Sequence, residues 1–470
     1  MTDVTPSRPA GDSAPSVDLY RAIWRWHFYA GLIAVPFMIL LAVTGSLYLF
    51  RDEIDHSAFA HRTVVALEST PQQAPSALIG RAQTAVPAAR VKAYRPPAGP
   101  TSSARVTLET ADGAAYVFLN PYSGAILATM LKRQEFNEVV RKLHSLEYFG
   151  PYANRLIEAM AGFAIILVIS GFYLWWPRRQ TGGVLSVRGT PSRRVFWRDT
   201  HAVTGAVAGG LIAFLALSGL PWSSFWGGKL TELAVATGTG YPAALWDAVP
   251  TSNEHAQHAL QTVGWTMEAS PMPMSHPMTG DGTMTAEPMG KGAEAAPLGI
   301  DRIVEIAHAR GLAPGFEVTL PDDATGVFTT AVFPDDLSKV RTIHIDQYSG
   351  KPLVDIGYAD YGPLAKITEF GINIHMGQQF GRVNQLLMLA TCLAIILSSV
   401  AAVVMWLKRR PAGRLGVPPY PTSRRVYGVL WGMAVVFGVM FPLSGLLIVA
   451  MVGLDILVIR RVPVLRRTFA

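Results

Sequence analysis

Four histidines stand at matching places in two pairs of sequence motifs. His27 lies in WRWHFYAG and His201 in WRDTHAVTG, and each is followed by glycine four residues later. His144 lies in HSLEYFG and His375 in HMGQQFG, and each is followed by Phe-Gly and then by an asparagine. Imidazole is a common metal ligand, and burying it without a partner costs on the order of a few kcal/mol. The repeated spacing therefore favours a shared metal-binding role, against the simpler interpretation of interfacial or capping histidines.

Each of these histidines opens or precedes an apolar run that is long enough to cross a bilayer. Four such runs lie near 28–50, 154–176, 202–222 and 384–407, and a fifth lies near 428–452. About 20 consecutive apolar residues span the hydrocarbon core. Half of the chain is hydrophobic and only 16% is charged, which indicates a multi-pass membrane protein. Because no signal-peptidase site follows the first run, we expect a retained helix.

Basic residues set the expected orientation in the membrane. The short connections 178–199 and 408–426 are rich in arginine, so we expect them in the cytoplasm. The N-terminus then lies inside, and the net charge of +7 reflects topology rather than nucleic-acid binding. The C-terminal arginines would lie outside if 427–459 crossed once, so the topology of that stretch stays open.

The segments between the apolar runs also repeat. YVFLNPYSGAIL (116–127) matches TIHIDQYSGKPL (342–353), with an Ala-rich helix expected before each and alternating strands around them. The sequence thus predicts a membrane α-helical bundle of four core transmembrane helices plus a C-terminal one, with two exported α+β modules and internal duplication. The expected segments are a cytoplasmic tail (1–24), transmembrane helices (25–50, 151–177, 200–224, 383–407), modules (51–150, 225–382) and a C-terminal membrane segment (427–459).

This topology places two histidines on each side of the membrane. His27 and His201 lie at the cytoplasmic edge, and His144 and His375 lie at the outer edge. Two axial imidazoles from separate helices can hold one b-type haem, so we predict two haem groups. A duplicated scaffold without chemistry is the alternative.

Neighbouring residues fit this interpretation. Gly31 and Gly205 follow the inner histidines by one helical turn and would leave room for a macrocycle, or would allow close helix packing. Arg25 and Arg198 adjoin the inner pair and would meet haem propionates. Further cations adjoin the outer pair, namely Arg141, Lys142 and Arg382.

Other histidines and the single cysteine carry weaker signals. His56, His61, His308 and His344 have no repeated counterpart, and we expect them on the solvated surface. Cys392 lies in the fourth run, so the exported regions contain no disulfide and the chain has no C-x-x-C-H attachment site.

A methionine-rich stretch at 267–291 interrupts the second module. Its composition predicts a flexible outer loop, and the simplest interpretation of that loop is a low-complexity linker. Thioethers favour Cu(I), so the stretch also contains candidate copper ligands at Met272, Met274, His276 and Met278.

The Trp/His/Gly entry, the H-x4-F-G motif and the D/N-x-Y-S-G turn resemble the PepSY-associated transmembrane family over roughly residues 20–410. This resemblance implies PepSY-like periplasmic modules, haem b and single-electron reduction of Fe(III)-siderophore at the bacterial cytoplasmic (inner) membrane. It implies His27, His144, His201 and His375 as haem ligands.

The electron donor is left open between quinol and a cytoplasmic reductase, because no G-x-G-x-x-G nucleotide signature is present. Other functions remain open as well: copper handling or copper reduction, a non-redox PepSY sensor or regulator, and a permease. The middle of the four main runs lacks charged residues, which disfavours a permease.

Overall fold

The computed structural model describes residues 15–178, 182–247, 249–275, 296–418, 423–459 and 461–469. The chain divides into two compact units. The membrane unit comprises Met1–Ser46, His144–Phe225 and Leu389–Ala470. The sheet unit comprises Leu47–Leu143 and Trp226–Met388.

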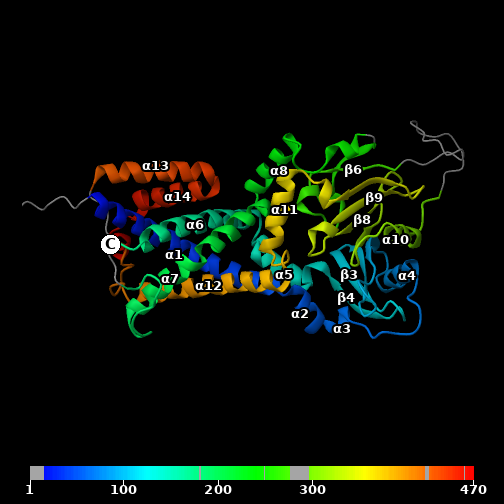
Figure 1. Ribbon diagram of the computed structural model, residues 1–470, viewed down its shortest axis with the longest axis horizontal. Helices are drawn as coiled ribbons and strands as arrows, with labels where there is room; N and C mark the ends of the chain where they lie inside the picture. The colour runs from blue at the N-terminus through cyan, green and yellow to red at the C-terminus, as the bar shows by residue number, and fades with distance from the viewer. Residues whose placement is uncertain are drawn as a thin grey trace, which may run out of the picture. The chain divides into compact units, whose positions relative to one another are not determined.

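The membrane unit is built from long apolar helices, drawn with their labels in Figure 1. They are α1 (Pro15–Leu49), α6 (Pro151–Trp175), α7 (Arg194–Ser218), α12 (Gly381–Leu407), α13 (Arg424–Met440) and α14 (Pro442–Leu454). In the described chain, five helices are long and apolar enough to cross a membrane: Asp18–Leu49, Pro151–Trp175, Arg194–Trp222, Gly381–Leu407 and Pro442–Ile459. Large apolar side chains such as Val207 and Val439 are exposed on them, as expected for surfaces that face lipid. The prediction of a multi-pass helical membrane protein is confirmed.

Small residues let the membrane helices pack closely. Ala30, Ala34 and Ala159 are buried in one cluster of the bundle, together with Met160 and Phe163. Interfaces between membrane helices favour such residues because backbones can approach. Helices α1 and α6 therefore approach closely where this cluster lies.

Helix α14 packs on α6 through Gly162. A Cβ there would collide with the Ser444 hydroxyl, which donates to the Ala159 carbonyl at 2.9 Å. Only glycine at position 162 allows this approach.

The C-terminal stretch 427–459, whose topology the sequence leaves open, forms a pair of helices. Helix α13 ends at Met440 and α14 begins at Pro442, and the two lie side by side in Figure 1. Pro442 has no N–H to continue α13 and is accepted at the first position of a new helix. Gly438 and Gly445 make the reversal tight, since a Cβ on Gly445 would lie 2.6 Å from the Gly438 Cα.

This reversal places the C-terminus beside the second basic connection. The last helix, α15 (Pro463–Phe469), brings the Thr468 carbonyl within 2.8 Å of the Leu415 amide, which donates to it. Arg461 and Arg467 thus lie at the same end of the membrane unit as the 408–418 loop.

Helix α1 begins at Pro15, ten residues before the expected boundary at 25. Asp18 accepts a hydrogen bond from the Ser423 amide at 2.5 Å, and the Arg25 guanidinium donates to the Pro418 carbonyl at 2.5 Å. These contacts fix the start of α1 against Pro418 and Ser423.

The connections that follow α6 and α12 each fold back onto the tryptophan near the end of the helix. The Trp175 and Trp406 indole N–H groups donate to the carbonyls of Val184 and Leu415, each nine residues further on and each at 2.8 Å. Helices α6 and α12, which follow the motifs of His144 and His375, therefore end in the same way.

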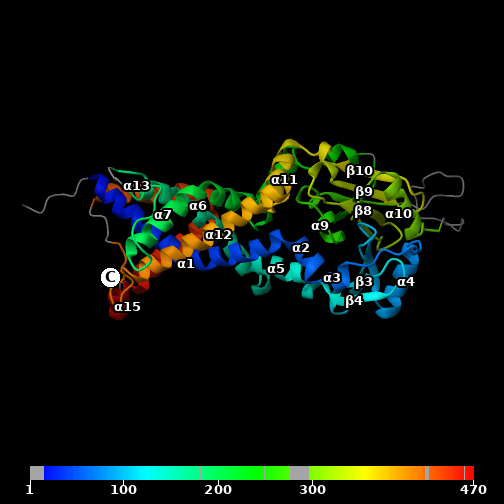
Figure 2. The same cartoon turned by 60° about the horizontal axis from the view of Figure 1, so that its bottom comes forward.

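The larger sheet of the sheet unit has eight antiparallel strands in the order β10-β9-β8-β7-β1-β2-β3-β4, and β5 (Thr251–His255) and β6 (Pro271–Pro273) form a separate two-stranded sheet. The strands are β1 (Arg90–Arg95), β2 (Ala104–Thr110), β3 (Gly113–Leu119), β4 (Ile126–Leu131), β7 (Glu317–Thr319), β8 (Val327–Val332), β9 (Arg341–Asp346) and β10 (Pro352–Gly357). Strands β1 and β7 pair through Ala93–Thr319 and Tyr94–Val318. The two expected modules thus share one continuous sheet, visible in Figure 2.

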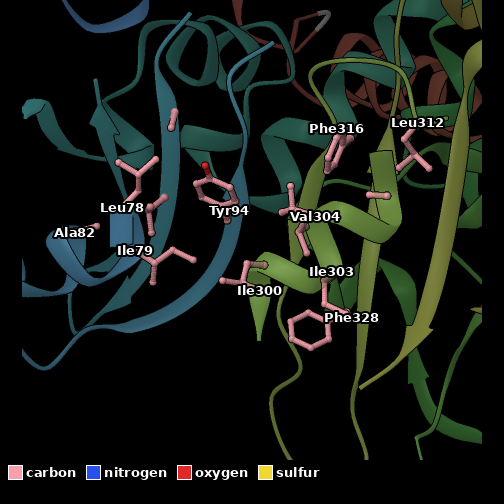
Figure 3. Packing of buried hydrophobic residues seen from close by; sticks show 14 of the residues in the cluster. Leu78, Ile79, Ala82, Tyr94, Ile300, Ile303, Val304, Leu312, Phe316 and Phe328 are labelled. Carbon is pink, nitrogen blue, oxygen red and sulfur yellow. The ribbon is translucent and has the colours of Figure 1, made fainter. Parts of the chain in front are cut away.

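Two helices cover one face of this sheet, α4 (Pro75–Ala85) and α10 (Ile300–Ala309). Figure 3 shows Leu78 and Ile303 from these helices directed to the same apolar cluster as Tyr94 and Phe328 from the strands. Alternate strand residues point to this core, as the pleat of a strand requires.

The two Y-S-G turns have the same geometry. The Asn120 Oδ1 accepts from the Tyr122 amide at 2.8 Å, and the Asp346 Oδ1 accepts from the Tyr348 amide at 3.1 Å. The following glycines have φ near +70°, a conformation that favours glycine.

The other face of the second half-sheet is covered by residues of 226–275 and by α11 (Pro363–His375). Met267 and Met272 are buried there, with 1% and 8% of their surface exposed. The prediction of a flexible loop from 267 onward is therefore wrong for 267–275, because methionine also fills apolar cores. His276 and Met278 lie outside the described residues.

Candidate functional site

The rings of His27 on α1 and His201 on α7 lie next to each other in the membrane unit. Their centroids are 6.0 Å apart, and the ring planes make an angle of 75°. If both imidazoles bound one metal, two metal–nitrogen bonds of about 2 Å and roughly 1 Å from each nitrogen to its ring centre would place the ring centroids about 6 Å apart. The separation thus fits two imidazoles that share one metal ion.

The hydrogen bonds of Ser170 determine the tautomer of His27. Its Nδ1 lies 2.8 Å from the Ser170 hydroxyl on α6. That hydroxyl donates its own hydrogen to the Ile166 carbonyl, so it accepts from His27 Nδ1–H. A neutral imidazole with a proton on Nδ1 has a free lone pair on Nε2. This is the state in which histidine binds metals, with the second nitrogen held by a protein acceptor.

His201 is held in the same tautomer by α12. Its Nδ1 lies 3.0 Å from the Ser398 carbonyl oxygen and 2.9 Å from the Ser398 hydroxyl. A carbonyl can only accept, so Nδ1 carries the proton and Nε2 the lone pair. Over the described ranges, neither Nε2 has a hydrogen bond, and the donor set fits an axial ligand pair.

The glycines near the inner pair differ in what surrounds them. A Cβ on Gly205 would meet nothing within 4 Å, which agrees with the predicted room for a macrocycle. A Cβ on Gly31 would lie 3.7 Å from Leu167, so that glycine belongs to ordinary helix packing. The glycine that faces an inner imidazole is Gly171, whose Cβ would lie 3.4 Å from His27 Cε1.

Both predicted propionate-binding arginines have protein partners. Arg198 pairs with the buried Asp199 through Nε at 2.8 Å, and Arg188 binds the same carboxylate at 2.8 Å. Arg25 donates to Pro418 and, at 3.1 Å, to the Tyr29 hydroxyl. A propionate would have to share these groups with their present partners.

His144 ends the amphipathic helix α5 (Phe136–His144) and is anchored to α1. Its Nδ1 lies 2.9 Å from the Thr44 hydroxyl, which donates to the Leu40 carbonyl at 2.7 Å. His144 Nδ1–H is therefore the donor, and Nε2 has the lone pair, as in the inner pair. A Cβ on Gly45 would lie 3.5 Å from His144 Cε1.

His375 is the last residue of α11 and belongs to the sheet unit. The Asn384 side-chain amide donates to the Ile374 carbonyl at 3.1 Å, as Asn154 donates to the Ser145 carbonyl at 2.9 Å beside His144. Since His144 and His375 belong to different units, their pairing stays a prediction.

The cations next to the outer histidines also have acidic partners. Arg141 and Lys142 lie 3.0 Å and 3.5 Å from Glu138, and Arg382 pairs with Glu53. Their role at propionates stays a prediction.

The prediction that His344 lies on the solvated surface is wrong. His344 is fully buried on β9, and its Nδ1 lies 2.9 Å from the Thr329 hydroxyl. Its Nε2 has no hydrogen bond to any residue that the structure describes. Burial lowers its pKa to about 4. His56, His61 and His308 are exposed, as predicted. In the described part of the chain, His, Cys, Asp and Glu form no metal-binding group of three or more.

The sequence also gave no sign of a carboxyl pair in the sheet unit. Burial and the nearby Glu369 raise the pKa of Glu268 to about 7. Glu369 itself accepts hydrogen bonds from the Thr266 amide and hydroxyl at 2.9 Å and 2.8 Å. The two carboxyls come from segments a hundred residues apart, so only the fold brings them together.

Some positioning residues were detectable in the repeat. Thr44-Gly45 and Ser218-Gly219 follow His27 and His201 by the same number of residues. Alignment of the two halves would have singled out this hydroxyl–glycine pair.

The comparison with protein families gives one match. The model described as PepSY-associated TM region matches residues 24–409. The search of curated proteins found no match to the chain.

Proposed function

The chain belongs to the PepSY-associated TM family, and on this premise we propose a haem b-containing metalloreductase that passes electrons across the membrane to Fe(III)-siderophore. The observation that carries the proposal is the pair His27 and His201, with centroids 6.0 Å apart and both Nδ1 atoms bonded to acceptors. Opposed imidazoles with free Nε2 lone pairs suit a metal that keeps its coordination during electron transfer.

When bound, haem b supplies one-electron transfer at a potential set by its axial ligands and its burial. His27 and His201 would hold one group, and His144 and His375 the second. The side chains around them exclude water and fix the ring orientations. Ser170 and Thr44 do this through their hydroxyls, and Ser398 through its carbonyl as well.

The proposed orientation puts the basic connections in the cytoplasm and the sheet unit in the periplasm of a bacterium. The reversal at Pro442 supports it, because Thr468 then lies beside Leu415 and the C-terminal arginines stay with the other basic residues. The outer histidines would be on the periplasmic side, next to the substrate.

The partners follow from this arrangement. Quinol or a cytoplasmic reductase would deliver electrons to the inner pair, and Fe(III)-siderophore would accept them outside. Fe(II) would leave because a hard-oxygen chelator binds it poorly.

A visible spectrum of the purified protein tests the proposal first. We expect an α-band typical of b-type cytochromes after reduction, with two haem groups per chain. Anaerobic mixing of the reduced protein with a Fe(III) chelate should restore the oxidised spectrum, and a Fe(II)-specific dye should develop colour. A colourless protein would favour the sensor or permease alternatives.

The copper alternative has its own test. The same reduced protein would be mixed with Cu(II), and faster re-oxidation than with the Fe(III) chelate would favour copper reduction. The buried Met272 packs with Leu260 and Val327, and Met274 bonds through its amide to the Pro250 carbonyl at 2.8 Å. Copper binding by this stretch stays a prediction.

A further inference from the structure

The two halves of the larger sheet meet at β1 and β7, and a row of charged side chains crosses this seam. Tyr94 and Val318 belong to the α4–α10 core, and Figure 3 shows Tyr94 directed to it. The next residues along the two strands, Arg95 and Glu317, therefore lie on the opposite face of the sheet. Arg105 on β2 is the register partner of Arg95. Three adjacent strands thus each contribute one charged side chain to the row.

Arg95 and Arg105 share one acceptor, the Glu317 carboxylate. Arg105 Nη2 donates to Glu317 Oε2 at 2.8 Å, and Arg95 Nη2 lies 3.5 Å from the same oxygen. The second oxygen, Oε1, accepts from the Thr262 hydroxyl at 3.1 Å. In the part of the chain that the structure describes, both arginine Nε–H groups are buried without a partner. Since each guanidinium has five N–H donors, the pair offers many more donors than one carboxylate can accept.

The row can be reached from solvent on its arginine side. The Arg95 side chain is 37% exposed and that of Arg105 is 18% exposed, whereas that of Glu317 is only 5% exposed. The Arg105 Cζ lies 4.3 Å from the centroid of the Tyr116 ring, a contact that orients the guanidinium. The arginines therefore form the accessible side of the row and the carboxylate its buried side.

Lys132 adds a third cation near the arginines. It lies in η1 (Lys132–Gln134), directly after β4. Its ammonium has no hydrogen bond or ion pair to any described residue. Burial is the main cause that lowers the pKa of Lys132; Glu138 and Glu317 oppose this decrease, and the positive charge of Arg105 adds to it. The ammonium is thus partly buried near a like charge and lacks an acceptor.

The charges of this group do not balance. Three cations face one carboxylate, that of Glu317, which leaves an excess of two positive charges. The other nearby carboxylates have cations of their own, since Glu138 lies 3.0 Å from Arg141 and Glu135 lies 3.1 Å from Arg62. Like charges at opposite positions of neighbouring strands destabilise a sheet. A bound dianion would remove this imbalance.

We propose that the seam cluster, which consists of Arg95, Arg105, Lys132 and Glu317, binds a phosphate group that carries two negative charges. Guanidinium groups match phosphate oxygens in a bidentate manner, and a lysine meets them as a point charge. The ligand would balance the excess charge and accept from the N–H donors that Glu317 does not use. Because β1 and β7 pair through only two residue pairs, it would also hold the two halves of the sheet together. The proposal goes beyond electron transfer and does not depend on bound haem.

Equilibrium dialysis of the full chain in detergent against radiolabelled phosphate tests the site, at a pH where phosphate is the dianion. We expect saturable binding of one phosphate per chain, and at least about tenfold weaker competition by acetate, a monoanion, than by unlabelled phosphate. Arg95→Gln and Lys132→Gln should each weaken phosphate binding by about tenfold or more, because each removes a charge that meets the phosphate. Arg302→Gln, at an exposed arginine of α10 in the same unit, is the control and should bind phosphate like the wild type.

Glu317→Gln should give a change of the opposite sign. Its amide oxygen can still accept from Arg105 or Thr262, while the negative charge that competes with phosphate is gone. We therefore expect tighter phosphate binding than in the wild type. Lys132→Gln removes no hydrogen bond or ion pair to the described residues, so it tests the site even if Arg95→Gln does not fold.

The same dialysis in nanodiscs distinguishes two sources of the phosphate group. Binding of labelled phosphate in phosphatidylcholine discs would assign the site to a free phosphate or a soluble phosphate ester. Displacement of that label by phosphatidate in the disc would assign it to a lipid headgroup. Absence of saturable binding in detergent and in discs, equal competition by acetate and phosphate, or unchanged affinity in both Arg95→Gln and Lys132→Gln would overturn the site.

Discussion

His27 in the membrane unit and His344 in the sheet unit have nearly the same hydrogen bonds and different neighbours. Each has its Nδ1 near a hydroxyl, Ser170 in one case and Thr329 in the other. His27 faces the imidazole of His201, while His344 faces the indole of Trp246 with ring centroids 6.4 Å apart. An imidazole whose Nδ1 lies near a hydroxyl is therefore not enough to favour a metal site. The proposed haem site depends on the second imidazole, that of His201.

Removal of one inner imidazole is the strongest way to test this comparison. His27→Ala or His201→Ala should remove about half of the haem, because one axial ligand cannot hold the group alone. His344→Ala should remove none. Haem extracted per mole of protein is the measurement. Loss of haem from the His344 variant, or loss of all haem from one inner variant, would contradict the assignment.

The outer histidines should give the complementary result. His144→Ala or His375→Ala should remove the other half of the haem and leave the spectrum of the inner group unchanged. The double variant His27→Ala/His144→Ala should be free of haem if the two sites are independent. A single outer substitution that abolished the inner spectrum would show that the sites are coupled or wrongly paired.

The sequence predicted the histidines and the apolar helices because both depend on short, periodic patterns. It failed at His344 for a tertiary reason. Ile343 and Ile345 point to the α4–α10 core, so the alternation of the strand places His344 on the opposite face, which would be solvated in an isolated module. Residues 226–275 cover that face, and no local sequence pattern predicts that they do.

The residues that position the inner histidines were also beyond sequence reasoning. Ser170 precedes Trp175 by five residues, and Ser398 precedes Trp406 by eight, so an alignment of the two halves does not pair them. Both serines hold the Nδ1 atom of a histidine only because of how the helices pack. Likewise, Phe441-Pro442 indicates a break in the helix, but the sequence leaves open whether the chain crosses, bends or turns back there.

The two serines provide a matched pair of variants. Ser170→Ala removes the hydroxyl that accepts from His27 Nδ1–H, whereas Ser398→Ala leaves the Ser398 backbone carbonyl 3.0 Å from His201 Nδ1. Loss of such a partner costs about 10–100-fold in metal affinity. Ser170→Ala should weaken haem retention by that amount and raise the midpoint potential, since a less basic imidazole stabilises Fe(III) less. Haem transfer to an acceptor protein and a redox titration measure both effects. Equal changes in the two variants would show that the carbonyl does not hold His201.

The smallest effect concerns His344, whose pKa is lowered from 6.5 to about 4 by burial. Below pH 6.5 the unfolded chain binds a proton that the folded sheet unit refuses, so stability falls as the pH falls toward 4. At pH 5 this lowers the free energy of unfolding by about 2 kcal/mol. His344→Gln should flatten the pH dependence of thermal unfolding between pH 7 and 5, and His308→Gln, on the exposed surface, should not. If both variants kept the full dependence, another group would be responsible, and His344 would lose its role as the titrating core histidine that contrasts with the membrane pair.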